Sequence, residues 1–200
     1  MDGIAWAASA MSAAQSRLEI AADNLANASS NGFRRRAARG FLTQSGVRVA
    51  GNESAEQGPL RRTGRAFDLA LIGRGAFQLR DSHGAIEHTR SGAFTRDRFA
   101  RLGDDAGRVL LGAHGAVRLP DGATIETDGS IRNAGKIVDR IALRPGASIR
   151  SGFLESSNVN AISEMIDVLC AQRSFESAQK VLSAIDMTRQ KSTDELARLK

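Results

Sequence analysis

The residues best suited to proton transfer or metal binding are the three histidines, His83, His88 and His114. They lie in turn-rich sequence without the His-x-x-x-His spacing of a helical zinc site, and no cysteine joins them. Ordinary strand or surface positions explain these histidines better. We therefore predict no metal site and no catalytic residue, and an enzyme using these side chains stays a rival interpretation.

A second group that could do chemistry is acidic: Asp121, Glu126 and Asp128 could bind calcium or form a carboxylate pair. Both aspartates precede glycine, however, and Asp-Gly is what a tight turn requires. Gly73-Arg74-Gly75 lacks the third glycine and the following helix of a dinucleotide loop, and no Gly-x-Ser-x-Gly elbow occurs. Cys170, the single cysteine, falls in a helical apolar pattern and is expected to be a small buried hydrophobe. We predict no cofactor and no small-molecule substrate.

The charge of the chain raises another possibility, because 28 Lys and Arg against 22 Asp and Glu give a net charge of +6. The one dense basic run is Arg34-Arg35-Arg36 with Arg39, and clustered guanidinium groups can bind phosphate. These arginines follow a predicted helix C-terminus, where positive charge is favoured, and no aromatic platform accompanies them. We predict no nucleic-acid partner, and a basic nucleic-acid-binding module is kept as the alternative function.

The N-terminal segment has a seven-residue repeat, which predicts a helix with a narrow apolar seam. Alanine occupies the second seam position, so a partner helix could approach closely. Asn31-Gly32 supplies residues that tolerate a left-handed conformation and stop the helix, and Phe33 resumes the chain. The large seam residues are Ile4, Met11, Leu18 and Leu25, and the alanines are Ala7, Ala14, Ala21 and Ala28.

The middle of the chain, residues 58–152, holds 15 of the 20 glycines and all three prolines. Short runs of alternating apolar residues are separated by turn sequences, as in residues 67–71 and 77–79. Asp121-Gly122 and Asp128-Gly129 bracket Ile125 as hairpin turns would. These features predict a small antiparallel β domain.

After Asn158 the pattern becomes helical again. Asn160 can cap the helix, and Glu164 falls in its first turn. One apolar stripe is expected to start this helix and to continue after a phase shift, before the polar sequence 189–192 interrupts it. The stripe comprises Ile162, Ile166 and Leu169, followed by Phe175, Ala178, Leu182 and Ile185.

Together these segments predict an α+β fold in which long N- and C-terminal helices form a coiled-coil-like pair and the centre is an antiparallel β-rich domain. The boundaries are an N-terminal axial helix and signature loop at 1–33, a linker at 34–57, the β-rich domain at 58–152 and a C-terminal axial helix at 153–200. A β domain of this size closes its own core and leaves little apolar surface for two distant helices. The competing interpretation is one compact monomer in which both helices cover the sheet.

Three stretches resemble the flagellar basal-body rod and hook proteins. Residues 22–34 resemble that family's Asn-Asn-x-Ala-Asn-x-x-Thr-x-Gly-Phe-Lys signature, with Asp23, Ser30 and Arg34 as departures. Residues 152–160 and 171–176 resemble its C-terminal Gly-x-Leu-Glu-x-Ser-Asn-Val and Gln-Arg-x-Tyr/Phe-Glu pattern, and residues 67–77 and 89–94 give a third match. The positions that carry the N-terminal signature are Asn24, Asn27, Gly32 and Phe33.

The resemblance implies a structural subunit of the flagellar rod that polymerises into a helical tube and transmits torque. Its expected partners are further copies of itself, other rod proteins and the flagellar type III export apparatus. That route agrees with an opening sequence that lacks a secretory signal, and it implies a periplasmic rod within the basal body. The opening Met1-Asp2 and the brief middle segment resemble the proximal rod protein more than the distal one. The expected assembly interface is formed by Asn24, Asn27, Gly32, Phe33 and the large apolar residues of the two helical seams.

Overall fold

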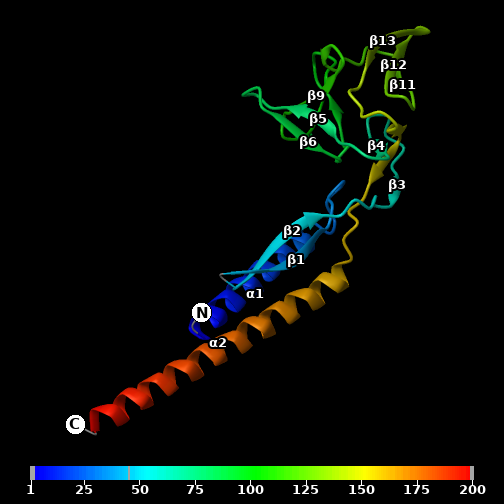
Figure 1. Ribbon diagram of the computed structural model, residues 1–200. Helices are drawn as coiled ribbons and strands as arrows, with labels where there is room; N and C mark the ends of the chain where they lie inside the picture. The colour runs from blue at the N-terminus through cyan, green and yellow to red at the C-terminus, as the bar shows by residue number, and fades with distance from the viewer. Residues whose placement is uncertain (1–2, 45, 199–200) are drawn as a thin grey trace. The chain divides into compact units, whose positions relative to one another are not determined.

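The computed structural model describes residues 3–44 and 46–198, so the Met1-Asp2 opening lies outside the described residues. The fold is α+β and divides into two compact units (Figure 1). The helical unit contains the chain up to Ala28, Arg35–Ser54, and the chain from Val159 onward. The β unit contains residues 29–34 and 55–158. Neither described helix is both long enough and apolar enough to cross a membrane.

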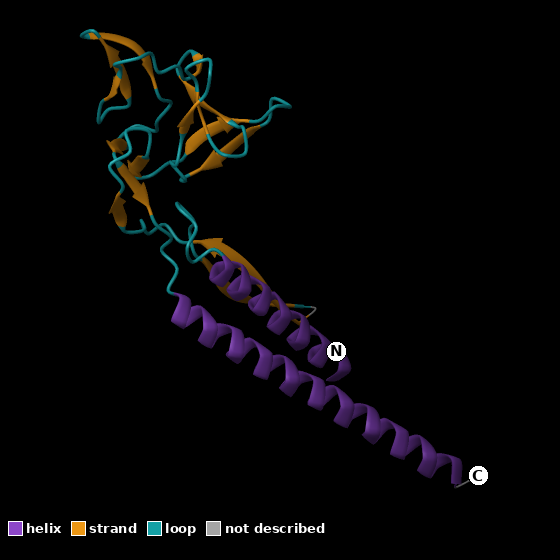
Figure 2. Cartoon of the chain, turned by 180° about the vertical axis from the view of Figure 1, so that it is seen from behind, coloured by secondary structure: helices purple, strands orange, loops and turns teal. Residues whose placement is uncertain are grey.

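Two helices of opposite direction make up most of the helical unit. Helix α1 spans Gly3–Ala26 and helix α2 spans Ala161–Arg198, and they lie side by side in both views (Figures 1 and 2). Gly3 lies against Ile185, whereas Asn24 is hydrogen-bonded to Glu164, so the end of α1 meets the start of α2. Asn160 caps α2, because its side-chain oxygen accepts the backbone N–H groups of Ile162 and Ser163. The cap fixes where α2 begins.

Small residues form the contact face of α1. Ala7, Ala14 and Ala21 are buried at heptad spacing, and the large seam residues beside them are only half-buried. Alanine at the contact lets two helix backbones approach closely. The seam residues Ile4, Met11, Leu18 and Leu25 therefore flank a line of alanines.

The face of α2 that is turned inward differs from the predicted stripe. Its buried residues are Glu164, Ala171 and Ala178, while Ile162 and Leu169 are exposed. A single stripe with a phase shift was the expectation; the structure has two faces instead. Steps of four and three residues join Glu164, Val168, Ala171, Phe175, Ala178, Leu182 and Ile185 on one face, whereas Ile162, Ile166 and Leu169 fall on another.

The segment 34–57, expected to be a linker, contains a β hairpin. Strands β1 (Arg36–Thr43) and β2 (Gly46–Glu53) pair in antiparallel register along their whole length, and both contact α1. Gly46 has a φ of +115°, and a Cβ there would lie 2.3 Å from the Ser9 hydroxyl oxygen. Only glycine fits so close to the helix with that backbone conformation. The hairpin is therefore an ordered part of the helical unit, packed against α1, rather than a linker.

The β unit consists of short antiparallel strands. The largest sheet has the order β6-β5-β9-β8-β7, with β10 pairing with β9. A second sheet has the order β11-β12-β13, and two-stranded sheets join β14 to β4 and β15 to β3. The bounds are β3 Leu60–Arg62, β4 Leu69–Ile72, β5 Phe77–Arg80, β6 Ile86–Thr89, β7 Thr95–Arg96, β8 Leu102–Gly103, β9 Val109–Gly112, β10 Gly115–Ala116, β11 Thr124–Ile125, β12 Ser130–Asn133, β13 Lys136–Arg140, β14 Ser148–Ser151 and β15 Phe153–Glu155.

The C-terminal segment expected at 153–200 therefore does not start as a helix. Phe153–Glu155 is strand β15, which pairs with β3, and α2 begins only at Ala161.

The two predicted Asp-Gly turns of the β unit are present, since Gly122 and Gly129 have φ values of +76° and +81°, as such turns require. A single apolar core holds the β unit together and comprises Leu69, Leu71, Phe77, Leu79, Phe94, Leu102, Leu110, Val117, Leu119, Ile131, Ile141 and Ile149.

Candidate functional site

Asn24, near the end of α1, connects three elements of the helical unit. Its side chain is fully buried. The Nδ2 group donates to the Arg36 carbonyl oxygen at 2.8 Å and to Glu164 Oε2 at 3.0 Å, and Oδ1 accepts the Arg36 N–H at 2.8 Å. The amide therefore uses both its donor and its acceptor sides to fix the start of β1 against α1 and α2.

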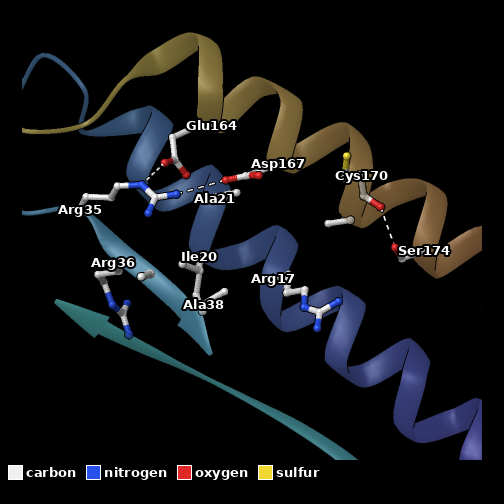
Figure 3. Close-up of a pocket in the computed structure, with 12 residues that line it drawn as sticks. Arg17, Ile20, Ala21, Arg35, Arg36, Ala38, Glu164, Asp167, Cys170 and Ser174 are labelled. Atoms are coloured by element: carbon white, nitrogen blue, oxygen red, sulfur yellow. Dashed lines mark hydrogen bonds and ion pairs between the residues drawn. The ribbon is translucent and has the colours of Figure 1, made fainter. Parts of the chain in front are cut away.

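Glu164 is the acidic centre of the same cluster, and only 1% of it is exposed. Its Oε1 accepts a hydrogen bond from Arg35 Nε at 2.5 Å, and Arg35 Nη2 also lies 3.2 Å from Asp167 Oδ2 (Figure 3). A buried carboxylate is tolerated only when it is paired and hydrogen-bonded. Asn24 and Arg35 together meet that requirement, so we name Asn24, Arg35, Arg36 and Glu164 the polar clamp.

A cavity of about 350 Å³ lies beside the polar clamp, between α1, β1 and α2. Its walls combine alanines with charged groups, and Figure 3 shows the Arg17, Arg35 and Arg36 side chains around it. Ser174 Oγ donates to the Cys170 carbonyl oxygen, so this hydroxyl is engaged with its own helix. Cys170 is exposed rather than buried, because its position lies off the inward face of α2. Among the described residues this cavity holds no histidine that could serve as a base.

The histidines and carboxylates considered for catalysis do not converge on one another. Asp121 pairs with Arg96, Glu126 with Arg132, and Asp128 with Arg140. The hydroxyl and backbone N–H of Ser130, with Arg140 nearby, hold the pKa of Asp128 below its usual range. His83 lies near Asp81, His114 lies near Asp139, and His88 is exposed on β6. Within residues 3–44 and 46–198, no cluster of three or more His, Cys, Asp or Glu could hold a metal ion.

A second buried ion pair lies inside the β unit. Arg90 and Glu155 are 5% and 1% exposed, and Arg90 Nε donates to Glu155 Oε2 at 2.7 Å. The guanidinium also donates to the carbonyl oxygens of Leu71, Gly73 and Gly75 at 2.6–2.9 Å. Glu155 Oε1 accepts the Gly58 N–H at 3.2 Å. This pair fixes the loop after β4 to strand β15.

The four predicted signature positions divide between the two units. Asn24 belongs to the polar clamp, and Asn27 donates to the Asp23 carbonyl oxygen at 2.9 Å. Gly32 and Phe33 lie in the β unit, where the Gly32 N–H donates to the Glu155 carbonyl oxygen at 2.7 Å. The signature is therefore not one site. It joins the end of α1 to the first residues of the β unit.

Sequence reasoning did not assign a contact role to Arg35, Arg36, Arg90, Glu155 or Glu164. The arginines were attributed to a helix terminus, although Arg35 pairs with Glu164 and Asp167, and Arg36 lies 3.6 Å from Asp23. The heptad position of Glu164 in the sequence could have indicated this ion pair. Glu164 precedes the buried Ala171 and Ala178 by one and two heptads, and a carboxylate at a seam position calls for a cationic partner.

Two family models match the two ends of the chain. Residues 4–34, which include nearly all of α1, match the family model described as "Flagella basal body rod protein". Residues 150–195, which include most of α2, match the model "Flagellar basal body rod FlgEFG protein C-terminal". The two matches include Asn24 and Glu164 of the polar clamp, one on each helix.

Relatives match over most of the chain. Flagellar basal-body rod protein FlgF of Rhizobium meliloti (strain 1021) is 30% identical, over 90% of this chain and 91% of the relative. FlgF of Escherichia coli (strain K12) is 28% identical, over 88% and 92%. FlgG of Agrobacterium fabrum is 25% identical, over 93% and 96%. On these matches, this chain belongs to the flagellar basal-body rod protein family, whose members are structural components of the flagellum.

Proposed function

We propose that this chain polymerises into a helical tube of the flagellar rod, and that the tube transmits torque. The observation that carries the proposal is the exposed apolar face of α2. Ile162, Met165, Ile166 and Leu169 are 53–72% exposed, although they are large apolar residues close together in the first turns of one helix. We call these four residues the outer face. An exposed apolar patch of this kind marks an interaction surface.

Helix geometry supports neighbouring copies as the occupant of the outer face. The inward face of α2 already packs on α1 within one chain, so a further helix would cover the opposite side. A contact between two different faces of identical subunits is heterologous, and repeating it without closure gives a helical filament. Burying one large aliphatic side chain contributes about 1.5–3 kcal/mol, and every subunit would repeat this gain.

The finer parts of the proposal concern pairing, export and position. We infer that α1 and α2 behave as a coiled-coil-like pair, because their contact positions recur every seven residues. We further propose export by the flagellar type III apparatus without a cleaved signal, assembly in the periplasm with other rod proteins, and a proximal position in the rod.

The test compares two substitutions on α2 that introduce the same charge. Ile166→Asp should abolish rod assembly and swimming, since each new contact would bury an unpaired carboxylate. Gln179→Asp, at an exposed position of α2 ten residues beyond the end of the outer face, should leave both nearly intact. Swimming in soft agar and recovery of the chain in isolated basal bodies measure the effect, with circular dichroism as the check of folding.

A second comparison separates assembly from site-based chemistry. His88→Ala and Asp128→Asn should leave swimming nearly intact, because their side chains are exposed in the β unit. Leu182→Asp should abolish assembly by separating α2 from α1 while the β unit remains folded. Normal swimming of the Ile166→Asp and Leu182→Asp cells, with loss only in the His88 or Asp128 variants, would overturn the tube proposal.

A further inference from the structure

The positive charge of the protein is concentrated in the β unit. This unit contains 17 Lys and Arg against 12 Asp and Glu, whereas the rest of the chain contains 11 against 10. The β unit therefore carries +5 of the net charge of +6. Net charge of one sign on a unit selects partners of the opposite sign.

Most acidic side chains of the β unit already have local cationic partners. Asp97 pairs with Arg101, Asp104 with Arg108, and Glu155 with Arg90. Several cationic side chains of the β unit form no ion pair within residues 3–44 and 46–198, and Arg61, Arg62 and Arg150 are among them. All three are exposed; Arg61 and Arg62 lie on β3, and Arg150 lies on β14, the strand before β15, which pairs with β3. Part of the positive charge of the β unit therefore lies near the β3–β15 pair.

An aromatic ring organises two of these arginines. The Arg150 guanidinium carbon lies 4.1 Å from the centroid of the Phe153 ring. Arg62 is the direct cross-strand partner of Phe153 in the β3–β15 pair, and residues paired in this way share a face of the sheet. The cation–π contact restricts the Arg150 side chain before any partner binds, so this side chain loses less conformational entropy on binding. We call Arg62, Arg150 and Phe153 the arginine platform.

We propose that the arginine platform binds a carboxylate-rich segment of a different protein. Guanidinium groups match carboxylates through paired, parallel hydrogen bonds, and two of them close together can bind two acidic side chains. A second copy of this chain is a poor occupant, because its β unit also carries +5. Single-stranded nucleic acid is disfavoured too, since Arg150 already covers the ring on which a base would stack.

The experiment uses the full chain and a fluorescently labelled poly-glutamate peptide as the probe, with poly-glutamine of equal length as the uncharged comparison. The wild type should bind poly-glutamate, and added salt should weaken the binding. Arg62→Ala with Arg150→Ala should weaken binding by about tenfold or more, the loss expected when two charge-assisted contacts are removed. Arg80→Ala with Arg118→Ala removes the same charge from other exposed positions and should change affinity little.

Four results would overturn the proposal. The first is equal affinity of the wild type and the Arg62→Ala, Arg150→Ala variant for poly-glutamate, and the second is an equal loss of affinity in both double variants. The third is tighter binding of inorganic polyphosphate than of poly-glutamate. The fourth is a loss of self-association, measured by sedimentation, in the Arg62→Ala, Arg150→Ala variant alone. Arg62→Ala by itself, which keeps the Arg150 contact with Phe153, gives the same test without disturbing the ring. The swimming test of Ile166 concerns the helical unit, so either proposal can fail while the other stands.

Discussion

The two units of this chain differ in how many of their large apolar residues they bury, although Ile86, Phe99 and Ile137 of the β unit are also 53–55% exposed. The β unit buries Phe77, Phe94 and ten aliphatic side chains in one core. The helical unit buries mainly alanines and the polar clamp, and leaves Trp6, Phe41, Leu42 and the outer face of α2 exposed. Exposed large apolar residues are what a neighbouring subunit could cover. The difference teaches that the helical unit, rather than the β core, is where our proposal of contacts between subunits has to be tested.

The largest expected effect is on the core of the β unit. Phe77 is fully buried and makes an edge-to-face contact with Phe94, with ring centroids 5.3 Å apart. Phe77→Ala should destabilise the β unit by about 3–5 kcal/mol, since it removes apolar contact and leaves a cavity. Leu169→Ala, at an exposed position, should change the stability of the monomer by about 0.5 kcal/mol or less. Urea unfolding of both variants makes this comparison, and a similar loss for each would contradict it.

Replacing the two buried glutamates should also cost more stability in the β unit than in the helical unit. Glu155→Gln leaves Arg90 buried without its counter-charge, and breaking such a pair costs about 3–5 kcal/mol. Glu164→Gln should cost only about 1–2 kcal/mol, because 35% of the Arg35 side chain is exposed and water can solvate it. The urea transition of the β unit reports the first change, and helical circular dichroism reports the second. Equal losses would show that the polar clamp is as closed as the core pair.

Limited proteolysis of the monomer tests the comparison directly. We expect rapid cleavage in α1, α2 and the hairpin, and a resistant fragment close to residues 55–158, because local opening is easiest where few large side chains are buried. Mass spectrometry would give the fragment ends. Uniform resistance of the chain from Ile4 to Ile185 would favour the compact monomer in which the helices need no neighbour.

Periodicity was enough to predict both helices and the β-rich centre, because seven-residue and two-residue patterns follow directly from backbone geometry. It missed the hairpin of residues 36–53. Its strands carry arginine, alanine and glycine, and six of the eight β1 residues are exposed, so no regular alternation of buried apolar residues marks them. The inward face of α2 was missed for a related reason. Alanines and Glu164 carry that face, whereas Ile162, Ile166 and Leu169, the residues most visible in the sequence, are the exposed ones.

The smallest expected effect concerns Asp128, on the surface of the β unit. The Ser130 hydroxyl and N–H donate to its carboxylate at 2.5 and 2.9 Å, Arg140 lies 3.0 Å away, and the pKa of Asp128 is lowered as a result. A carboxylate whose pKa is lower in the folded state stabilises the fold at pH values above its unfolded pKa, about 3.9, and loses that contribution as the pH falls through the folded pKa. Asp128→Asn should therefore be slightly less stable than the wild type at pH 7, and the stabilities of the two proteins should converge only below about pH 4.

Urea midpoints of both proteins measured across this pH range test the prediction. Asp105→Asn is the control, since the described residues give the Asp105 carboxylate no hydrogen bond or ion pair. A difference between Asp128→Asn and the wild type that stays constant from neutral to acid pH would show that the Ser130 and Arg140 contacts do not bind the charged form in preference.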